Sequence, residues 1–247
     1  MKHYDAYLLD LDGTVYRGAE AVPGAAGFVA RALDRGAAVR YLTNNSAAEP
    51  SAVAEKLMAM GVACEPGWVY GTGPLAVREC KIRGHRSVFV VGEPSLHEMF
   101  SQAGLSASEE PPDCVVVGIC RSFTYALLER ASAFVRGGAD LIVTNRDATY
   151  PVEGGREQPG AGSIAAAVET ASGLVTVALG KPAPALVEWA LDGLGFPPSS
   201  ALVVGDRYET DVQSGKAAGC DTLLVLTGVT RVAPSGQPSV RDLSELE

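Results

Sequence analysis

Short apolar runs alternate with helical patterns along the whole 247-residue chain. The runs typical of strands are Tyr4–Leu9, Ala38–Leu42, Ser87–Val91, Cys114–Gly118, Asp140–Val143, Val175–Leu179, Ala201–Val204 and Thr222–Leu226. The intervening stretches repeat their apolar residues at the spacing of one helix face. Alternation of this kind predicts an α/β fold in which right-handed crossovers connect the strands of a parallel sheet.

Four stretches carry the clearest helical spacing. Their defining positions are Phe28, Ala32 and Arg35; Val53, Leu57 and Met60; Leu127, Ala131 and Val135; and Leu186, Ala190 and Leu194. The first follows the dipeptide Pro23-Gly24, which is typical of a turn. The second follows Ser46-x-x-Glu49, a capping-box pattern that predicts the start of a helix beside Ser46.

The composition excludes several classes of function. A formal net charge of −9 and the lack of any Lys/Arg cluster argue against nucleic acid, whose binding depends on neutralising phosphates. No apolar run is long enough to span a membrane, and the N-terminus has no apolar signal region. The five cysteines are odd in number and scattered without a C-x-x-C pair, which is typical of reduced thiols. We therefore expect a cytoplasmic protein with neither nucleic acid nor membrane as a partner.

Asp10 and Asp12 lie where the first apolar strand gives way to a turn containing Gly13. Carboxylates at the end of a buried strand need a partner for their charge, and a divalent cation with oxygen ligands is a natural one. The alternative is a helix N-cap followed by an unrelated acid, since such caps are common. These residues alone leave both interpretations open.

Three further strand ends carry complementary groups. Ligands in open parallel sheets bind beyond the carboxyl ends of the strands, so the residues that follow each strand are informative. These residues are Thr43-Asn44-Asn45-Ser46, Gly180-Lys181-Pro182 and Gly205-Asp206-Arg207 with Asp211. Together with Asp10 and Asp12 they supply carboxylates, hydroxyl and amide groups and an ammonium, a set that can hold a cation and a phosphate together.

Taken in order, these strand ends resemble the four motifs of the haloacid dehalogenase superfamily of phosphohydrolases. The matching residues are Asp10-x-Asp12-Gly13-Thr14, Thr43, Lys181 and Gly205-Asp206-x-x-x-x-Asp211. Four longer segments are similar to its subfamily IIA, the p-nitrophenyl phosphatase, phosphoglycolate, pyridoxal phosphate and nucleotide phosphatases. They are Thr43-Asn44-Asn45-Ser46, Pro159-Gly160-Ala161-Gly162-Ser163, Gly180-Lys181-Pro182 and residues 218–228. The resemblance implies a Rossmann-like parallel-sheet core with an inserted α/β cap of the C2 type.

The resemblance also implies a role for each motif residue. Asp10 is the expected nucleophile, and Asp12 the expected general acid and base. The expected Mg²⁺ ligands are the carboxylates of Asp10 and Asp206 and the backbone carbonyl of Asp12. Lys181 is expected to keep Asp10 ionised and, with Thr43, Asn44 and Asn45, to bind the phosphate. Asp211 is expected in a supporting role rather than as a direct ligand.

Each of these residues also has an ordinary structural interpretation. Thr43-Asn44-Asn45-Ser46 is also typical of a turn that feeds a capped helix. Lys181 before Pro182 suits a surface turn, and Asp211 suits the first turn of a helix. Only the occurrence of all four motifs in one chain favours the chemical interpretation.

About 130 residues separate Asn45 from Lys181, too many for a loop inside a compact domain. We predict a catalytic core of residues 1–81 and 174–247 and an inserted cap of residues 82–173. The segment from Thr144 to Pro151 matches the subfamily's substrate-facing loop, which makes Asp147 and Tyr150 candidates for substrate binding. Pyridoxal phosphatases carry His at the position of Tyr150, and this tyrosine could instead pack between core and cap. The resemblance also suggests a homodimer formed through the cap.

The sequence thus predicts a Mg²⁺-dependent phosphatase that hydrolyses a small phosphorylated metabolite, a phosphomonoester, through an aspartyl-phosphate intermediate. Two alternatives remain at this point. One is a phosphotransferase or mutase that acts on a sugar phosphate through the same intermediate. The other is a non-enzymatic regulator that accepts a phosphoryl group on Asp10.

Overall fold

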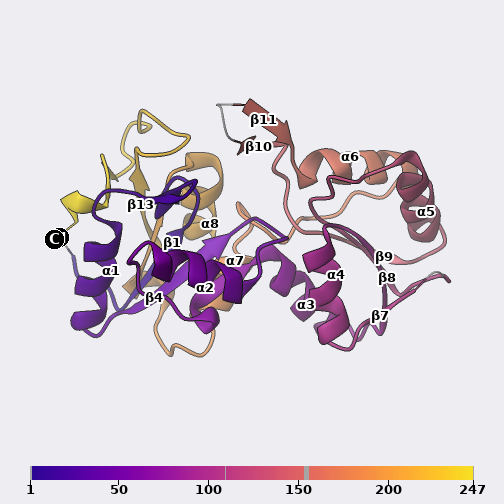
Figure 1. Ribbon diagram of the computed structural model, residues 1–247, viewed down its shortest axis with the longest axis horizontal. Helices are drawn as coiled ribbons and strands as arrows, with labels where there is room; N and C mark the ends of the chain where they lie inside the picture. Colours follow the sequence, from indigo (N-terminus) through magenta and orange to yellow (C-terminus); the bar gives the residue numbers. More distant parts are fainter. Residues whose placement is uncertain (1, 109, 153–155, 247) are drawn as a thin grey trace. The chain divides into compact units, whose positions relative to one another are not determined.

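The computed structural model describes residues 2–108, 110–152 and 156–246, and the chain divides into two compact units (Figure 1). The first unit contains residues 2–43, 50–70 and 181–246. The second contains Asn44–Glu49 and the described residues of the stretch from Gly71 to Gly180. Each unit has its own sheet, so each is described separately.

The first unit is built on a six-stranded sheet in the order β14-β13-β12-β1-β4-β5. Its strands are β1 (Ala6–Asp10), β4 (Ala38–Thr43), β5 (Val69–Gly71), β12 (Ala201–Gly205), β13 (Asp221–Val225) and β14 (Ser239–Val240). The central strand β1 pairs in parallel with both neighbours, and Ala6 lies opposite Ala38 on one side and Ala201 on the other. The carboxyl ends of β1, β4 and β12 therefore meet at one edge of the sheet.

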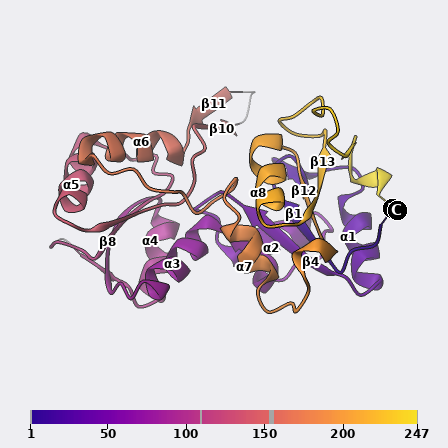
Figure 2. The same cartoon turned by 180° about the vertical axis from the view of Figure 1, so that it is seen from behind.

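Helices cover both faces of this sheet. Its helices are α1 (Ala25–Asp34), α2 (Pro50–Ala59), α7 (Ala185–Leu191) and α8 (Gln213–Ala217). Successive residues of β1 point to opposite faces. On one face Leu8 packs with Val187 and Ala190 of α7, and on the other Tyr7 meets Phe28 of α1 edge to face at 5.1 Å. Accordingly α7 and α8 lie in front of the sheet in Figure 2, with α1 behind it.

The second unit contains a four-stranded parallel sheet in the order β7-β6-β8-β9, also covered on both faces. Its strands are β6 (Ser87–Val91), β7 (Ser106–Ala107), β8 (Cys114–Val117) and β9 (Asp140–Val143). Helices α3 (Thr72–Ile82) and α4 (Pro94–Gln102) pack on one face, and α5 (Tyr125–Arg136) and α6 (Ala161–Ser172) on the other. The α/β fold predicted from the sequence, a parallel-sheet core with an inserted α/β unit, is confirmed.

The remaining elements are short. They are β2 (Tyr16–Arg17), β3 (Glu20–Ala21), η1 (Pro66–Trp68), β10 (Thr149–Val152), β11 (Arg156–Pro159), η3 (Pro198–Ser200), η4 (Tyr208–Val212) and η5 (Leu243–Glu245). The strands β10 and β11 form an antiparallel pair in the second unit. Within the described residues, no helix combines the length and apolarity that crossing a membrane requires.

The prediction of a strand over Val175–Leu179 is wrong. These residues form no strand, and the side chains of Val175 and Val177 are 77% and 82% exposed. The apolar alternation therefore faces solvent instead of a sheet. At the end of the segment, the Leu179 amide donates to the Val143 carbonyl of β9 at 3.0 Å.

The predicted helix start at Ser46 is also wrong. The Ser46 hydroxyl is buried in the second unit, where it accepts a hydrogen bond from the Ile119 amide at 3.1 Å. Helix α2 begins four residues later, at Pro50. Proline is well suited to a first helical position, because its fixed φ fits a helix and the first amides have no partner within it. Ser46 thus orders the segment after β4 instead of capping α2.

The second unit extends beyond the segment 82–173 expected from the sequence as an inserted domain. Ala76 and Cys80 of α3 pack against Leu96 and Phe100 of α4. The stretch that precedes Lys181 is tied to β9 by the Leu179 hydrogen bond. Residues 71–81 and 174–180 therefore belong to the second unit by their packing.

Candidate active site

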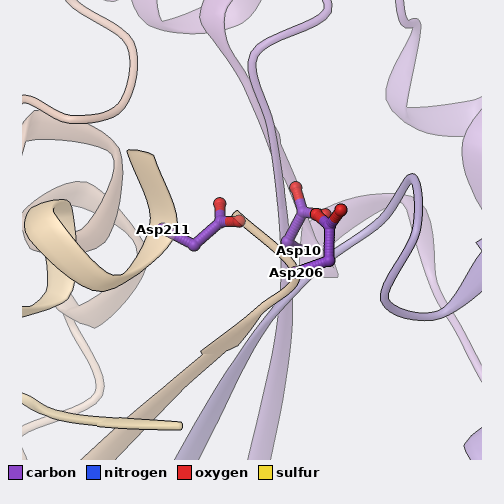
Figure 3. A group of neighbouring side chains, drawn as sticks. All are labelled: Asp10, Asp206 and Asp211. Atoms are coloured by element: carbon purple, nitrogen blue, oxygen red, sulfur yellow. The ribbon is translucent and has the colours of Figure 1, made fainter. Parts of the chain in front are cut away.

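Three aspartates from the edge of the first sheet form a buried cluster (Figure 3). Asp10 ends β1 and Asp206 follows β12, so the two neighbouring strands bring their carboxylates side by side. Asp211 lies in η4 and points its carboxylate toward the other two. One oxygen from each residue lies within 4.8 Å of the others, and the residues are 9%, 3% and 2% exposed. Like charges gathered in this way require compensation.

Lys181 supplies part of that compensation from the turn before α7. Its ammonium donates to Asp10 Oδ1 and to Asp211 Oδ1, each at 2.6 Å, and the residue is 3% exposed. Burial alone would lower the pKa of Lys181, but the two carboxylates outweigh it and raise this pKa above its usual value. Lys181 is therefore a fixed positive charge beside Asp10.

The cluster still carries more negative charge than one lysine can balance. Burial raises the pKa of Asp10 well above its usual value, against the opposing effect of Lys181. Burial and the charge of Asp211 raise the pKa of Asp206 to about 6. With all three acids ionised, two negative charges remain uncompensated, which equals the charge of one divalent cation. The all-oxygen donor set suits Mg²⁺ or Ca²⁺.

Two glycines make room for Asp206. A Cβ on Gly228 would lie 1.8 Å from Asp206 Oδ2, and one on Gly13 would lie 2.6 Å from the same oxygen. Gly13 also has a φ of 92°, which side chains other than glycine rarely adopt. The Val229 amide donates to Asp206 Oδ2 at 2.5 Å. The loop at 228–229 thus fixes the Asp206 carboxylate, a contribution that the sequence motifs did not reveal.

Hydrogen bonds also orient the other two acids of the cluster. The Thr14 hydroxyl donates to Asp10 Oδ2 at 3.2 Å, so both oxygens of Asp10 are engaged. Asp211 Oδ2 accepts from the Arg207 amide at 3.0 Å while its other oxygen binds Lys181. Asp211 therefore holds Lys181 and the turn after β12 in place.

Asp12 lies two residues beyond Asp10 but has different surroundings. The residue is exposed, and its Oδ2 accepts a hydrogen bond from the Tyr16 hydroxyl at 3.2 Å. The surrounding protein displaces enough water to raise the pKa of Asp12, and the nearby charge of Lys56 opposes that shift. Asp12 thus combines an ionisable carboxylate with access to solvent.

The residues expected to bind phosphate fall in both units. Thr43 ends β4 in the first unit and is buried. Asn44 belongs to the second unit, where its side-chain amide donates to Asp147 Oδ2 at 3.1 Å. Its carbonyl accepts from the Thr72 hydroxyl and from the Asn145 side-chain amide, both at 2.7 Å. The structure thus brings Asn44 and Asp147 together.

Asn45 and Tyr150 have separate surroundings in the second unit. The Asn45 side chain accepts from the Ala47 amide at 3.0 Å, as in an ordinary turn. The Tyr150 hydroxyl accepts from Arg121 Nε at 2.9 Å and donates to Gln158. Tyr150 also lines a cavity of about 500 Å³ whose apolar wall includes Phe123. Tyr150 is therefore part of the wall of a pocket within this unit.

Known proteins are similar to this chain in sequence and in fold. Residues 7–106 match the model of the haloacid dehalogenase-like hydrolase family, and residues 178–245 match a related HAD-hydrolase-like model. The chain is 39% identical over 232 residues to the 5'-nucleotidase YutF of Bacillus subtilis, covering 94% of this chain and 90% of the relative. The chain belongs to the haloacid dehalogenase-like hydrolases.

Other haloacid dehalogenase-like hydrolases are also similar to this chain in sequence or in structure. The acid sugar phosphatase of Staphylococcus epidermidis is 40% identical over 233 residues, or 93% of this chain and 89% of the relative. The solved 4-nitrophenylphosphatase of Thermotoga maritima superposes with a TM-score of 0.91 at 33% identity, covering 98% and 96% of the two chains. NagD of Escherichia coli K-12 gives 0.90 at 28% identity, covering 100% and 99%. The subfamily predicted from the sequence is confirmed.

Proposed function

We propose that this hydrolase is a Mg²⁺-dependent phosphatase that acts on small phosphorylated metabolites. The observation that carries the proposal is the contact of Lys181 with Asp10 at 2.6 Å inside the buried acidic cluster. A strand-end carboxylate held beside a fixed positive charge and a cation site suits attack on an anionic phosphate. The relatives point the same way, since they are named a 5'-nucleotidase, an acid sugar phosphatase and a 4-nitrophenylphosphatase.

The proposed metal ligands are the carboxylates of Asp10 and Asp206 and the backbone carbonyl of Asp12. The excess negative charge of the cluster and its all-oxygen chemistry support this assignment. Bound Mg²⁺ would neutralise the carboxylates and the charge that develops on the phosphate. Asp211 is proposed to support Lys181, with which it forms an ion pair, instead of binding the metal directly.

The proposed reaction has two steps carried by Asp10 and Asp12. In the first, a carboxylate oxygen of Asp10 bonds to phosphorus, the bond from phosphorus to the leaving oxygen breaks, and Asp12 gives that oxygen a proton. In the second, Asp12 takes a proton from water, whose oxygen bonds to phosphorus while the bond to Asp10 breaks and inorganic phosphate leaves. Splitting hydrolysis in this way replaces one difficult step with two easier ones.

The remaining residues of the proposed site bind and orient the phosphate. Lys181 neutralises one phosphate oxygen, and the Thr43 hydroxyl and the backbone at Asn44 and Asn45 donate hydrogen bonds. Positioning of this kind accounts for a large share of catalysis in phosphoryl transfer. None of these groups reaches beyond the phosphate, so the choice of leaving group must depend on other residues.

We assign that choice to the second unit, which we propose is the inserted cap. The loop that carries Asp147 and Tyr150 is the proposed specificity loop, and the cavity beside Tyr150 supports this role. Formation of a homodimer through the cap is part of the same proposal. The five cysteines are free and buried, which supports the expected cytoplasmic location.

A phosphate-release assay tests the proposed activity. A panel of nucleotides, sugar phosphates and 4-nitrophenyl phosphate is incubated with the protein and Mg²⁺, with and without an acceptor sugar. Phosphate release that is unaffected by the acceptor is the expected result. Transfer of the phosphoryl group to the sugar would instead identify a phosphotransferase, and a single stoichiometric phosphorylation without turnover would identify a phospho-accepting regulator.

A Tyr150→Ala substitution should change the relative kcat/KM for a nucleotide and for glycerol phosphate. Removing one aromatic contact is typically worth about 1–3 kcal/mol, or roughly 5- to 150-fold in discrimination. The matched variant Tyr150→Phe keeps the ring but loses the hydrogen bonds to Arg121 and Gln158, and should retain most of the preference. A loss by one common factor for every substrate would show that Tyr150 only supports the hairpin.

A further inference from the structure

One side chain binds the carboxylate of Asp12, and a second side chain packs on the first. The Tyr16 hydroxyl donates to Asp12 Oδ2 at 3.2 Å, and the ammonium of Lys56 lies 3.5 Å from the centroid of the Tyr16 ring. All three residues belong to the first unit, although Lys56 comes from helix α2, forty residues beyond Tyr16 in the chain. A lysine from a separate element thus packs on the ring that binds Asp12.

The backbone fixes where the Tyr16 ring can lie. The Tyr16 carbonyl accepts from the Gly13 amide at 2.8 Å, and the Tyr16 amide donates to the Leu11 carbonyl at 3.2 Å. These bonds close a tight turn that returns the chain to Asp12, and the Tyr16 residue is only 5% exposed. A buried ring in a closed turn has little rotational freedom, so its hydroxyl offers a fixed donor to Asp12.

Asp12 is more exposed than Asp10 and Asp206. Lys181 and Thr14 bind the carboxylate of Asp10, and the Val229 amide binds that of Asp206, whereas the carboxylate of Asp12 accepts its hydrogen bond from Tyr16. An exposed carboxylate can rotate between its staggered positions unless a hydrogen bond selects one. A proton donor must also lie within hydrogen-bond reach of the atom that it protonates. Its orientation therefore matters for the reaction.

We infer that Tyr16 and Lys56 are positioning residues that hold Asp12 in the orientation required for proton transfer to the leaving oxygen. The inference rests on the proposed function, which gives Asp12 that proton. Tyr16 retains its own proton throughout and acts only through the hydrogen bond to Asp12. Lys56 positions Asp12 through Tyr16, because an ammonium over an aromatic face is attracted to it and keeps the ring in place. This is separate from the effect of its charge on the pKa of Asp12.

The test uses substrates whose leaving oxygens depend to different degrees on a proton from Asp12. A series of ring-substituted phenyl phosphates, from 4-nitrophenyl to unsubstituted phenyl, keeps size and shape similar while the leaving group becomes poorer. The rate of the first step is measured in single turnover for the wild type and for the variants Tyr16→Phe and Lys56→Met. Tyr41→Phe is the matched control, because this buried tyrosine loses a hydrogen bond of 2.6 Å to the Ala63 carbonyl.

Tyr16→Phe should slow phenyl phosphate about tenfold more than 4-nitrophenyl phosphate, since misplacing a catalytic group costs up to roughly 100-fold. Lys56→Met should act in the same direction but less strongly, and Lys56→Arg should restore most of the loss. Tyr41→Phe should leave the dependence on the leaving group unchanged. Equal slowing of all substrates in both Tyr16→Phe and Lys56→Met would overturn the inference. If Tyr16→Phe fails to fold, equal slowing of all substrates in Lys56→Met is enough to overturn it.

A variant of Asp12 separates failure of the inference from failure of the proposed function. Asp12→Asn should show the steepest dependence on the leaving group, and adding Tyr16→Phe to it should cause no further change. If Asp12→Asn shows no such dependence, the proposed acid role of Asp12 is wrong. If Asp12→Asn shows it but the effect of Tyr16→Phe is fully additive, Tyr16 does not act through Asp12.

Discussion

An Asp10→Asn variant is expected to fold normally and to lose at least about 1,000-fold in turnover. The amide has the shape of the carboxylate but is a very poor nucleophile, and removal of a nucleophile is among the most damaging changes to an enzyme. Burial already raises the pKa of Asp10, so the neutral amide relieves the cost of a buried charge. Phosphate release and thermal unfolding of the same preparation are the measurements.

Asp221→Asn is the matched control for this experiment. Asp221 lies on β13 in the same unit, but its side chain is half exposed and pairs with Lys2 at 2.7 Å. The same chemical change there should leave turnover within about twofold of the wild type, because an exposed ion pair contributes little. Retention of a tenth of the wild-type kcat by Asp10→Asn would place the nucleophile elsewhere.

Removal of Mg²⁺ with a chelator should abolish hydrolysis and lower the melting temperature at neutral pH. A ligand that binds only the folded state at 100 times its Kd stabilises that state by about 2.7 kcal/mol, or roughly 5–10 °C for a chain of this size. Without the cation, the negative charges of Asp10, Asp206 and Asp211 repel one another and destabilise the folded state, because Lys181 balances only part of them. Asp206→Asn should raise the Mg²⁺ concentration needed for activity.

The increase in melting temperature that Mg²⁺ causes should become smaller as the pH falls. Without metal, the pKa of Asp206 is raised to about 6 in the folded protein, so this carboxyl binds a proton below that pH. The metal-free folded state therefore gains stability, relative to the unfolded state, as pH falls through 6 toward the usual value of aspartate. The gain from Mg²⁺ should shrink over the same range, because protons compete for the site. An equal gain at pH 5 and pH 8, or full activity in chelator, would refute the proposed metal site.

The sequence predicted that Asp10, Asp206 and Lys181 lie close together, and there is a physical reason why this could be predicted. Asp10 and Asp206 end neighbouring parallel strands, and such ends lie at one edge of a sheet. Lys181 reaches the cluster even though the strand predicted before it does not form. Its ion pairs with Asp10 and Asp211 anchor it there, so the motif was a better guide than the strand pattern.

Other features depend on tertiary contacts that no local pattern encodes. The hydrogen bond of Ser46 to Ile119 spans 73 residues and overrides a plausible capping box. The strand β11 is exposed and polar, so it lacks the apolar alternation by which a strand is predicted from sequence. The strand pair that carries Tyr150 could therefore not be predicted. The contact between Lys56 and Tyr16 depends on where α2 packs, which spacing alone cannot predict.

The proposed mechanism depends above all on an aspartyl phosphate at Asp10, which acid-quenched mass spectrometry can detect directly. The Asp12→Asn variant is mixed with Mg²⁺ and 4-nitrophenyl phosphate, because an activated leaving group needs little acid while loss of the base slows hydrolysis of the intermediate. The quenched protein is digested, and its peptides are compared with those of the double variant Asp10→Asn/Asp12→Asn. We expect one phosphoryl group on the peptide that contains Asp10, absent from the double variant. A phosphoryl group on another residue, or nitrophenol released without any phosphorylated peptide, would contradict the mechanism.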